Sequence, residues 1–223
     1  IEESSKEQKG ILLTYVDDIL VATNKEIGEA VMKRIDQEWK CSPEEVVEEN
    51  GPEVSFCGVC IQKTTKGIYV HQRPYTNDLL KKHQMDGCTS TKILLDKETE
   101  EDKENQSEPS AEVKIEDIRK AQKIAGEILW LSTRSRPDLS YPIQKMTSEA
   151  QGNPKKAIKI GTRILRYLKG TKDFGLFYPN EEETLKRYEE NKEDWPEELL
   201  ERTVVWTDSS YASQKDSKSQ GAF

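Results

Sequence analysis

Two short apolar runs near the start of the chain are separated by a pair of adjacent aspartates. The stretch ILLTYVDDILVAT predicts a β-hairpin over residues 11–23, with a tight turn at Asp17 and Asp18. Neighbouring carboxylates repel each other, and apolar strands do not offset that repulsion. The pair therefore requires either open water or a cation that binds both side chains.

The pattern then alternates between helix and strand. Apolar residues at helical spacing predict a helix over residues 24–39, with Asn24 as its N-cap. Residues 54–72 predict a second hairpin that turns at Thr-Lys-Gly, and a short helix follows from Pro74. Antiparallel hairpins combined with helices indicate an α+β fold.

Helical periodicity dominates the middle of the chain after a polar interruption. Residues 96–114 are acidic and aperiodic, which predicts a disordered linker. Apolar spacing then predicts helices over residues 115–135, 137–153 and 154–170. Pro142 lacks a backbone N–H, so it is expected to kink or restart the second of these helices.

A strand-like GLFY opens the last part of the chain. The highly charged residues 179–202 predict a solvated helix or an insertion. The final residues predict a strand that carries Asp208, a loop and the start of another strand. The chain thus divides into four segments, which are residues 1–95, 96–114, 115–173 and 174–223.

The composition indicates folded parts separated by solvated segments, because apolar and charged residues each make up 34% of the 223 residues. A net charge of -8 argues against a nucleic-acid binder as a whole, although binding depends on local patches. No apolar run is long enough for a membrane span, and the polar start excludes a signal peptide. We therefore expect an intracellular protein, in a cytoplasmic particle or the nucleus, whose two chain ends look cut.

A CxxC pair, Cys57 and Cys60, is followed by His71 and His83. A structural zinc site requires four convergent ligands. In a strand, a spacing of three residues points two thiols to opposite faces. The spacing therefore favours small apolar side chains that fill the core over metal ligands.

The paired aspartates and a basic helix are the candidate functional features. A hairpin tip with two carboxylates suits Mg²⁺, and metal ions at such a tip support phosphoryl transfer. An ordinary surface turn is the alternative, because Asp is common in turns. The residues alone leave both interpretations open.

The segment from 154 to 172 holds seven basic residues and no acidic one. Four of them share one helical face and suit the phosphates of a nucleic-acid duplex; they are Lys156, Lys159, Arg163 and Arg166. The alternative is a solvated face that pairs with nearby carboxylates.

Several segments together resemble one family. TYVDDILVAT resembles the metal-binding hairpin of a reverse transcriptase. The stretches FCGVCIQKTTKGIYVHQRPYTNDLLKKHQM, GEILWLSTRSRPDLSY and RILRYLKGTKDFGLFY resemble, in the same order, the polyprotein of copia-type LTR retrotransposons. WTDSSYASQKDSKSQGAF resembles the opening of that family's ribonuclease H domain.

The resemblance implies a fold and a set of site residues. Residues 1–95 would form the C-terminal part of the polymerase palm, residues 115–173 thumb-like or connection helices, and residues 174–223 a truncated ribonuclease H-like domain. Asp17 and Asp18 match the palm aspartates that bind Mg²⁺, with Mn²⁺ as an alternative. The remaining matches are Tyr15 near the primer end and nucleotide, Phe56 and Gly58 in the primer grip, and Asp208 as the first metal-binding carboxylate of ribonuclease H.

By the same resemblance, the partners are an RNA or DNA template–primer duplex, deoxynucleotides and other parts of a retrotransposon polyprotein. The family places a further palm aspartate and the nucleotide-binding fingers before the hairpin, and further ribonuclease H carboxylates after Asp208. We therefore expect this chain by itself to be inactive as a polymerase. Two alternatives are a non-catalytic remnant that binds nucleic acid through the basic helix and a relic with no stable function.

Overall fold

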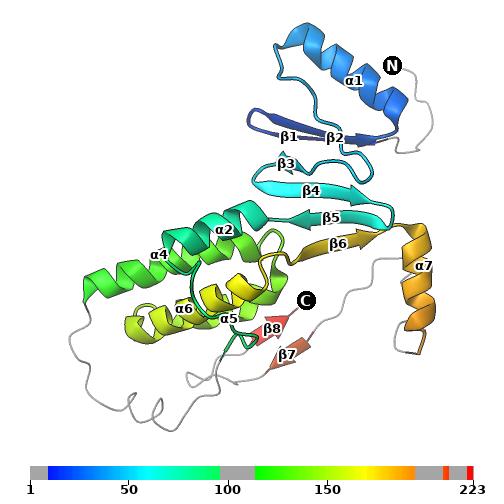
Figure 1. The fold of residues 1–223 in the computed structure, drawn as a ribbon. Helices are drawn as coiled ribbons and strands as arrows, with labels where there is room; N and C mark the ends of the chain where they lie inside the picture. The colour runs from blue at the N-terminus through cyan, green and yellow to red at the C-terminus, as the bar shows by residue number, and fades with distance from the viewer. Residues whose placement is uncertain (1–9, 96–113, 194–207, 211–219, 223) are drawn as a thin grey trace. The chain divides into compact units, whose positions relative to one another are not determined.

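The computed structural model describes residues 10–95, 114–193, 208–210 and 220–222, and it confirms a chain of mixed α and β structure (Figure 1). Residues 1–177 and residues 178–223 form two compact units, which we treat separately. The predicted linker over residues 96–114 lies outside the described residues except for Lys114. No helix in the described ranges combines the length and the apolar character needed to cross a membrane.

The first hairpin consists of β1 (Gly10–Tyr15) and β2 (Asp18–Thr23), which pair antiparallel as predicted. Tyr15 lies opposite Asp18, so the two turn residues are Val16 and Asp17. The predicted turn at Asp17 and Asp18 is therefore wrong by one residue, because Asp18 already pairs in the ladder as the first residue of β2.

Helix α1 (Lys25–Glu38) follows the hairpin. Its start confirms the predicted N-cap, since the Asn24 side chain accepts a hydrogen bond of 2.9 Å from the Ile27 N–H. Ile35 is the buried residue of this helix. The apolar spacing therefore predicted this helix correctly, although the helix buries few of its apolar residues.

A four-stranded sheet has the order β3-β4-β5-β6, with β3 (Val54–Phe56), β4 (Val59–Thr64), β5 (Gly67–His71) and β6 (Gly175–Pro179). The sequence predicted one continuous strand where the structure has β3, a turn and β4. Cys57 and Gly58 form that turn with φ values of 50° and 74°. Two successive positive φ angles match the twist of a two-residue hairpin, so the chain reverses where the apolar run seemed unbroken.

Strand β6 confirms the predicted strand near residue 175, but it extends the sheet of β3–β5. The sequence pattern had placed it with the C-terminal segment. A hydrogen bond from the Tyr69 hydroxyl to the backbone oxygen of Asp173 joins β5 to the approach of β6. Pairing of strands that lie far apart in the sequence leaves no signal in local periodicity.

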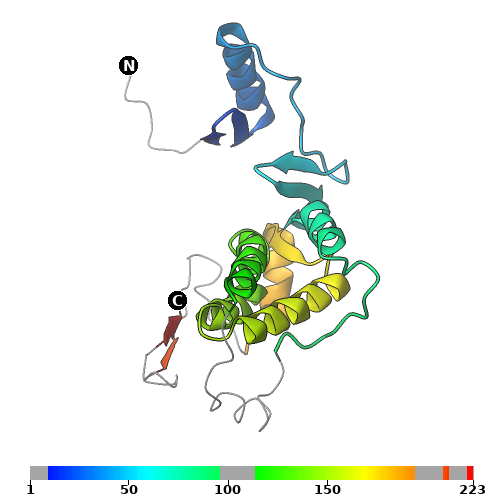
Figure 2. The ribbon, with the colours of Figure 1, turned by 90° about the vertical axis from the view of Figure 1, so that its left-hand side faces the viewer.

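Four helices, which lie between β5 and β6 in the sequence, form a bundle (Figures 1 and 2). They are α2 (Arg73–Lys82), α4 (Ile115–Ser132), α5 (Ser140–Glu149) and α6 (Pro154–Gly170). A 3₁₀ turn, Pro137–Leu139, precedes α5 and Pro142 lies in its first turn. The predicted restart is thus confirmed, because the first backbone N–H groups of a helix have no intrahelical partner to lose.

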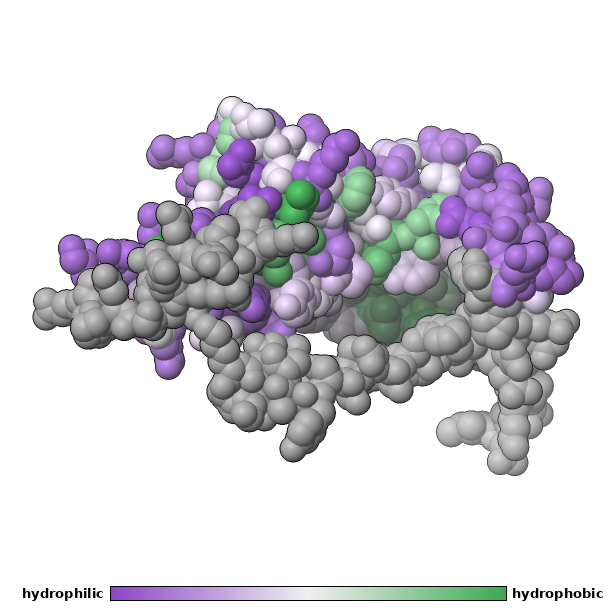
Figure 3. Space-filling view, turned by 90° about the horizontal axis from the view of Figure 1, so that it is seen from below, coloured by the Kyte–Doolittle hydropathy of each residue, from purple (hydrophilic) through white to green (hydrophobic). Residues whose placement is uncertain are grey.

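The hydrophobic core lies between these helices. Ile124 and Ile128 of α4 pack there with Met146 of α5 and Ile164 of α6. Helix α6 approaches closely at Gly161, where an added Cβ would stand 2.7 Å from Met146 Cε and 2.8 Å from Ile124 Cγ2. Apolar residues on the outside form separate patches among hydrophilic ones, as the face in Figure 3 shows.

A buried arginine joins the end of α6 to the connection between α4 and α5. Arg136 is 2% exposed and donates from Nε and Nη2 to both oxygens of Asp138, at 2.9 and 2.8 Å. Its Nη1 and Nη2 also donate to the backbone oxygen and the hydroxyl of Thr171, each at 2.9 Å. Tyr167 completes this Arg136 clamp by donating its hydroxyl to Asp138 over 3.1 Å.

The second unit contains α7 (Glu181–Glu190), β7 (Asp208–Ser210) and β8 (Gln220–Ala222). Asn180 caps α7 by accepting from the Glu183 N–H at 2.9 Å, so part of the charged segment 179–202 is helical as one interpretation predicted. Strands β7 and β8 pair antiparallel with Asp208 opposite Ala222. The remaining predicted strand residues before Asp208 lie outside the described residues.

Replacing Arg136 by lysine should weaken the bundle. A lysine has one ammonium group in place of the planar fork, so it cannot serve Asp138 and Thr171 together. We expect the free energy of unfolding to fall by about 2–3 kcal/mol in urea denaturation followed by circular dichroism.

Arg134→Lys is the matched control. Arg134 lies two residues earlier, is exposed, and stacks on Trp130 at 4.7 Å. Its replacement should cost about 0.5–1 kcal/mol. Equal effects of the two variants would contradict a special role of the Arg136 clamp.

Candidate metal and nucleic-acid sites

The paired aspartates stand at the solvent-exposed tip of the first hairpin. Asp17 lies in the turn and Asp18 begins β2, directly across from Tyr15. All three residues are exposed. Neither aspartate side chain makes a hydrogen bond or ion pair within the described part of the chain, and none joins the tip to the second hairpin or to α6. The structure therefore places both carboxylates in open water, with no protein group from the described residues beside them to offset their repulsion.

The turn that carries Asp17 is strained. Val16 has a φ of 53°, a left-handed conformation that β-branched residues rarely adopt. Val16 is also 87% exposed, so no apolar packing offsets that cost. Strained backbone of this kind, at about 1–3 kcal/mol, is found preferentially at functional sites and ligand clamps.

The turn predicted for the primer grip packs against helix α4. A Cβ added at Gly58 would stand 3.5 Å from the Trp130 ring, and the φ of 74° suits glycine. Phe56, on the strand before the turn, is half-buried. The geometry shows a packing role for Gly58, while contact of Phe56 and Gly58 with a primer stays a prediction.

The predicted basic face of α6 is partly used inside the protein. Arg163 Nε donates to the Ile93 carbonyl at 3.0 Å, and Arg166 Nε donates to the Thr89 carbonyl at 2.9 Å. Lys156 pairs with Glu149 at 2.8 Å. Lys159 is exposed on the same face.

The irregular segment 89–93 therefore lies along this face, because its open carbonyls accept from the helix. Half of the predicted phosphate-binding stripe is thus engaged with the chain's own backbone. Binding of nucleic acid by these four residues remains a prediction.

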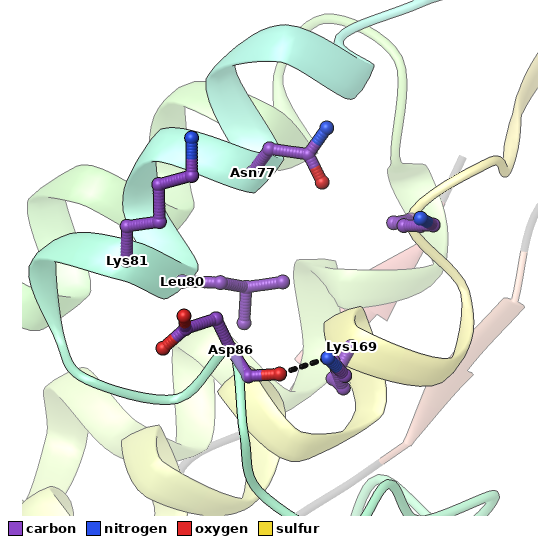
Figure 4. A pocket seen from close by; sticks show the side chains of 6 residues that line it. Asn77, Leu80, Lys81, Asp86 and Lys169 are labelled. Atoms are coloured by element: carbon purple, nitrogen blue, oxygen red, sulfur yellow. Dashed lines mark hydrogen bonds between the residues drawn. The ribbon is translucent and has the colours of Figure 1, made fainter.

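A second group of lysines, which the sequence pattern did not predict, lines a pocket between α2 and α6 (Figure 4). The pocket has a volume of about 180 Å³ and is lined by Lys81, Lys169 and Lys172 together with Asn77, Leu80 and Asp86. Lys169 donates to the backbone oxygen of Asp86 at its rim. Lys169 at the end of α6 and Lys172 just after it are close in the sequence, but their meeting with Lys81 needs the fold. We call the hollow lined by Lys81, Lys169 and Lys172 the lysine pocket.

A carboxylate joins the C-terminal end of α2 to α4. Glu127 accepts from Lys82 at 2.7 Å and from His83 at 2.6 Å. Burial acts to raise the pKa of Glu127, but the hydrogen bonds from Lys82 and His83 outweigh it and lower the pKa below the usual value. The contribution of Glu127 to stability is thus present at neutral pH and is lost as the pH falls below about 4.5.

A third cluster was missed because it depends on strand register. Cys60 on β4 lies opposite His71 on β5, and Glu53 precedes β3 beside them. Burial first, and then the Glu53 charge, raises the pKa of the Cys60 thiol. Burial and then the Arg73 charge lower the pKa of His71 against the opposing pull of Glu53. The other two residues of the CxxC and histidine set lie outside this cluster. Cys57 is in the turn before β4, and His83 is hydrogen-bonded to Glu127.

Asp208, the predicted ribonuclease H carboxylate, is the first residue of β7 in the second unit. Its place in β7 agrees with the predicted strand that carries it, and its role stays a prediction.

Comparison with known proteins finds relatives from plant transposons. The chain is 27% and 25% identical over 193 residues to the retrovirus-related Pol polyproteins from transposons RE2 and RE1 of Arabidopsis thaliana, covering 82% of this chain. It is also 28% identical over 170 residues to the uncharacterized mitochondrial protein AtMg00810 of the same plant, covering 74% of this chain and 64% of that protein. No family model matches the chain, and no solved structure matches it.

The predicted resemblance to a retrotransposon polyprotein is confirmed by these relatives. The chain spans 12% of the length of each of the two transposon polyproteins.

Replacing Val16 by asparagine should stabilise the first hairpin, because asparagine tolerates the left-handed conformation better than a β-branched residue. We expect amide hydrogen exchange in β1 and β2 to slow by up to about fivefold, equivalent to about 1 kcal/mol. Val46→Asn is the control, since Val46 is exposed and has no positive φ. Faster exchange in Val16→Asn would contradict the assignment of strain to this residue.

Proposed function

We propose that this chain, a relative of transposon Pol polyproteins, is part of an RNA-directed DNA polymerase with ribonuclease H, of the copia type of retrotransposon. The observations that support this most directly are the transposon Pol relatives and the strained turn that carries Asp17 next to Asp18 and Tyr15. Residues 10–95 would then contribute to the polymerase palm, and residues 115–170 to thumb-like or connection helices.

The aspartate pair fits a hard divalent cation. Carboxylate oxygens are the ligands that Mg²⁺ and Mn²⁺ prefer, and both side chains are open to solvent and to a substrate. Within the described ranges no third ligating side chain joins Asp17 and Asp18. Other ligands would come from water, from nucleotide phosphates and from other parts of the polyprotein.

Each hairpin residue has a distinct role in this proposal. Asp17 and Asp18 hold the cation, which when bound stabilises charge on the phosphates during nucleotidyl transfer. Tyr15 is 56% exposed and stands across from Asp18, so its ring is available to pack against the primer end or the incoming nucleotide. The antiparallel ladder fixes the backbone of Tyr15 and Asp18 relative to each other, which the chemistry requires.

A second candidate function is nucleic-acid binding without catalysis. The lysine pocket favours it, because Lys81 of α2, Lys169 of α6 and Lys172 just after α6 line one hollow. Such groups neutralise backbone phosphates and read no sequence. The same surface would serve the template–primer duplex in an active enzyme, so the two candidates differ only at the aspartate hairpin.

Manganese binding at the hairpin tests the polymerase proposal. Small amounts of Mn²⁺ added to the ¹⁵N-labelled chain should broaden the amide signals of residues 15–19 in preference to other exposed carboxylate regions. The double variant Asp17→Asn/Asp18→Asn should lose this broadening, because amides bind hard cations much more weakly than carboxylates. Asp36→Asn, an exposed aspartate on α1, should retain it. Equal broadening around Asp36, or its persistence in the double variant, would contradict the proposal.

A salt titration of duplex binding tests the lysine pocket. We expect Lys81→Glu/Lys172→Glu to weaken binding of a short RNA–DNA duplex, measured by fluorescence anisotropy, at least about tenfold at low salt. The slope of log affinity against log salt should fall by about 0.9 for each phosphate that the variant no longer neutralises. Lys33→Glu/Lys40→Glu, at two exposed lysines on and just after α1, makes the same charge change elsewhere and should have a smaller effect. Equal slopes for the two variants would rule out the lysine pocket as the duplex surface.

A further inference from the structure

Three side chains of different chemistry meet on one face of the four-stranded sheet. Cys60 and His71 are directly paired across β4 and β5, so their side chains leave the sheet on the same side. Glu53 reaches them from the segment before β3. The ligand atoms of all three side chains lie within 4.8 Å of one another.

The centre of this cluster is buried and incompletely satisfied. His71 is fully buried and Cys60 is 6% exposed, whereas Glu53 is 38% exposed and opens the cluster to solvent. Nε2 of His71 lies 3.1 Å from Glu53 Oε2, but this contact lacks the alignment of a good hydrogen bond. A buried polar atom that is poorly satisfied costs free energy, and a bound ion is one way to satisfy it.

We propose that Glu53, Cys60 and His71 bind a zinc ion. Sulfur, nitrogen and oxygen together are a ligand set that suits Zn²⁺ and disfavours Mg²⁺. Three protein ligands leave a fourth tetrahedral position for water on the exposed Glu53 side. The site is independent of the all-oxygen pair at Asp17 and Asp18 and goes beyond the proposed polymerase function.

Local charges are compatible with this ion. A Cys60 thiolate and the Glu53 carboxylate together balance the two charges of Zn²⁺. Arg73 is the nearest cation, with Nη1 3.8 Å from Glu53, but its Nε is 2.7 Å from Asp173 Oδ1. The arginine charge is therefore already compensated by Asp173.

Binding of Zn²⁺ determines the protonation of Cys60 and His71. The Cys60 thiol releases its proton to water, and the ion bonds to the thiolate. His71 would bind through Nε2, the ring nitrogen that faces Glu53, with its proton on Nδ1. The 3.3 Å contact from the Arg73 N–H to Nδ1 must then open, which predicts a small local shift at the start of α2.

Cysteine alkylation in the unaltered 223-residue chain tests the site directly. After treatment with a chelator, or with one equivalent of Zn²⁺, the rate of iodoacetamide modification is followed at each cysteine by mass spectrometry. We expect zinc to slow modification of Cys60 at least about tenfold. The three reference thiols Cys41, Cys57 and Cys88 should change little. Equal slowing at all four, or none at Cys60, would overturn the proposal.

Cobalt substitution gives a second readout with variants. The wild-type chain with Co²⁺ should show a thiolate-to-metal charge-transfer band with a stoichiometry of one ion. Cys60→Ala and His71→Gln should abolish the band or weaken binding at least about tenfold, and Cys57→Ser should retain it. Asp17→Asn/Asp18→Asn should also retain it, which separates this site from the polymerase proposal. Disappearance of the band in Cys57→Ser but not in Cys60→Ala would overturn the assignment.

Discussion

The buried guanidinium of Arg136 is the interaction on which the arrangement of the other elements depends. It satisfies both oxygens of Asp138 and both oxygens of Thr171, and it is stacked between Tyr167 at 5.6 Å and Phe174 at 5.5 Å. A buried charge is tolerated only when it is fully paired, so few alternative packings of these segments satisfy it. Because Thr171 lies between α6 and β6, the clamp fixes the helix that carries Lys169 and the strand that completes the sheet.

Local signals accounted for most of the helices. Asn24 and Pro154 mark helix starts by capping chemistry and a fixed φ, and apolar spacing sets the buried faces. The break at Cys57 and Gly58 was missed, because an apolar run with one glycine also suits a continuous strand. The place of β6 could not be predicted, since its pairing with β5 arises from tertiary packing and not from neighbouring residues.

The candidate sites also differ in whether local sequence or tertiary packing brings their residues together. Asp17 and Asp18 are adjacent in the sequence, so their meeting needed no fold. The partners of Arg163 and Arg166 are carbonyls of an irregular segment, which carries no periodic signal. The Glu53, Cys60 and His71 cluster requires the register of β4 against β5, and that register is known only once the turn before β4 is placed. A site built from two strands can therefore be predicted from the sequence only if the turn that sets their register can be predicted.

The two hairpins differ in how their turns are supported, and this decides what each is suited to do. The turn at Cys57 and Gly58 uses glycine for one left-handed residue and rests on Trp130, so the strands beyond it are held in place. The turn at Val16 has neither advantage, and Ile11, Leu12 and Leu13 on its strand are about half exposed. A two-stranded hairpin is marginally stable by itself. To hold its carboxylates precisely, the first hairpin would need another surface against its apolar residues. The sheet that holds Cys60 and His71 has no such need, because it packs against the helices.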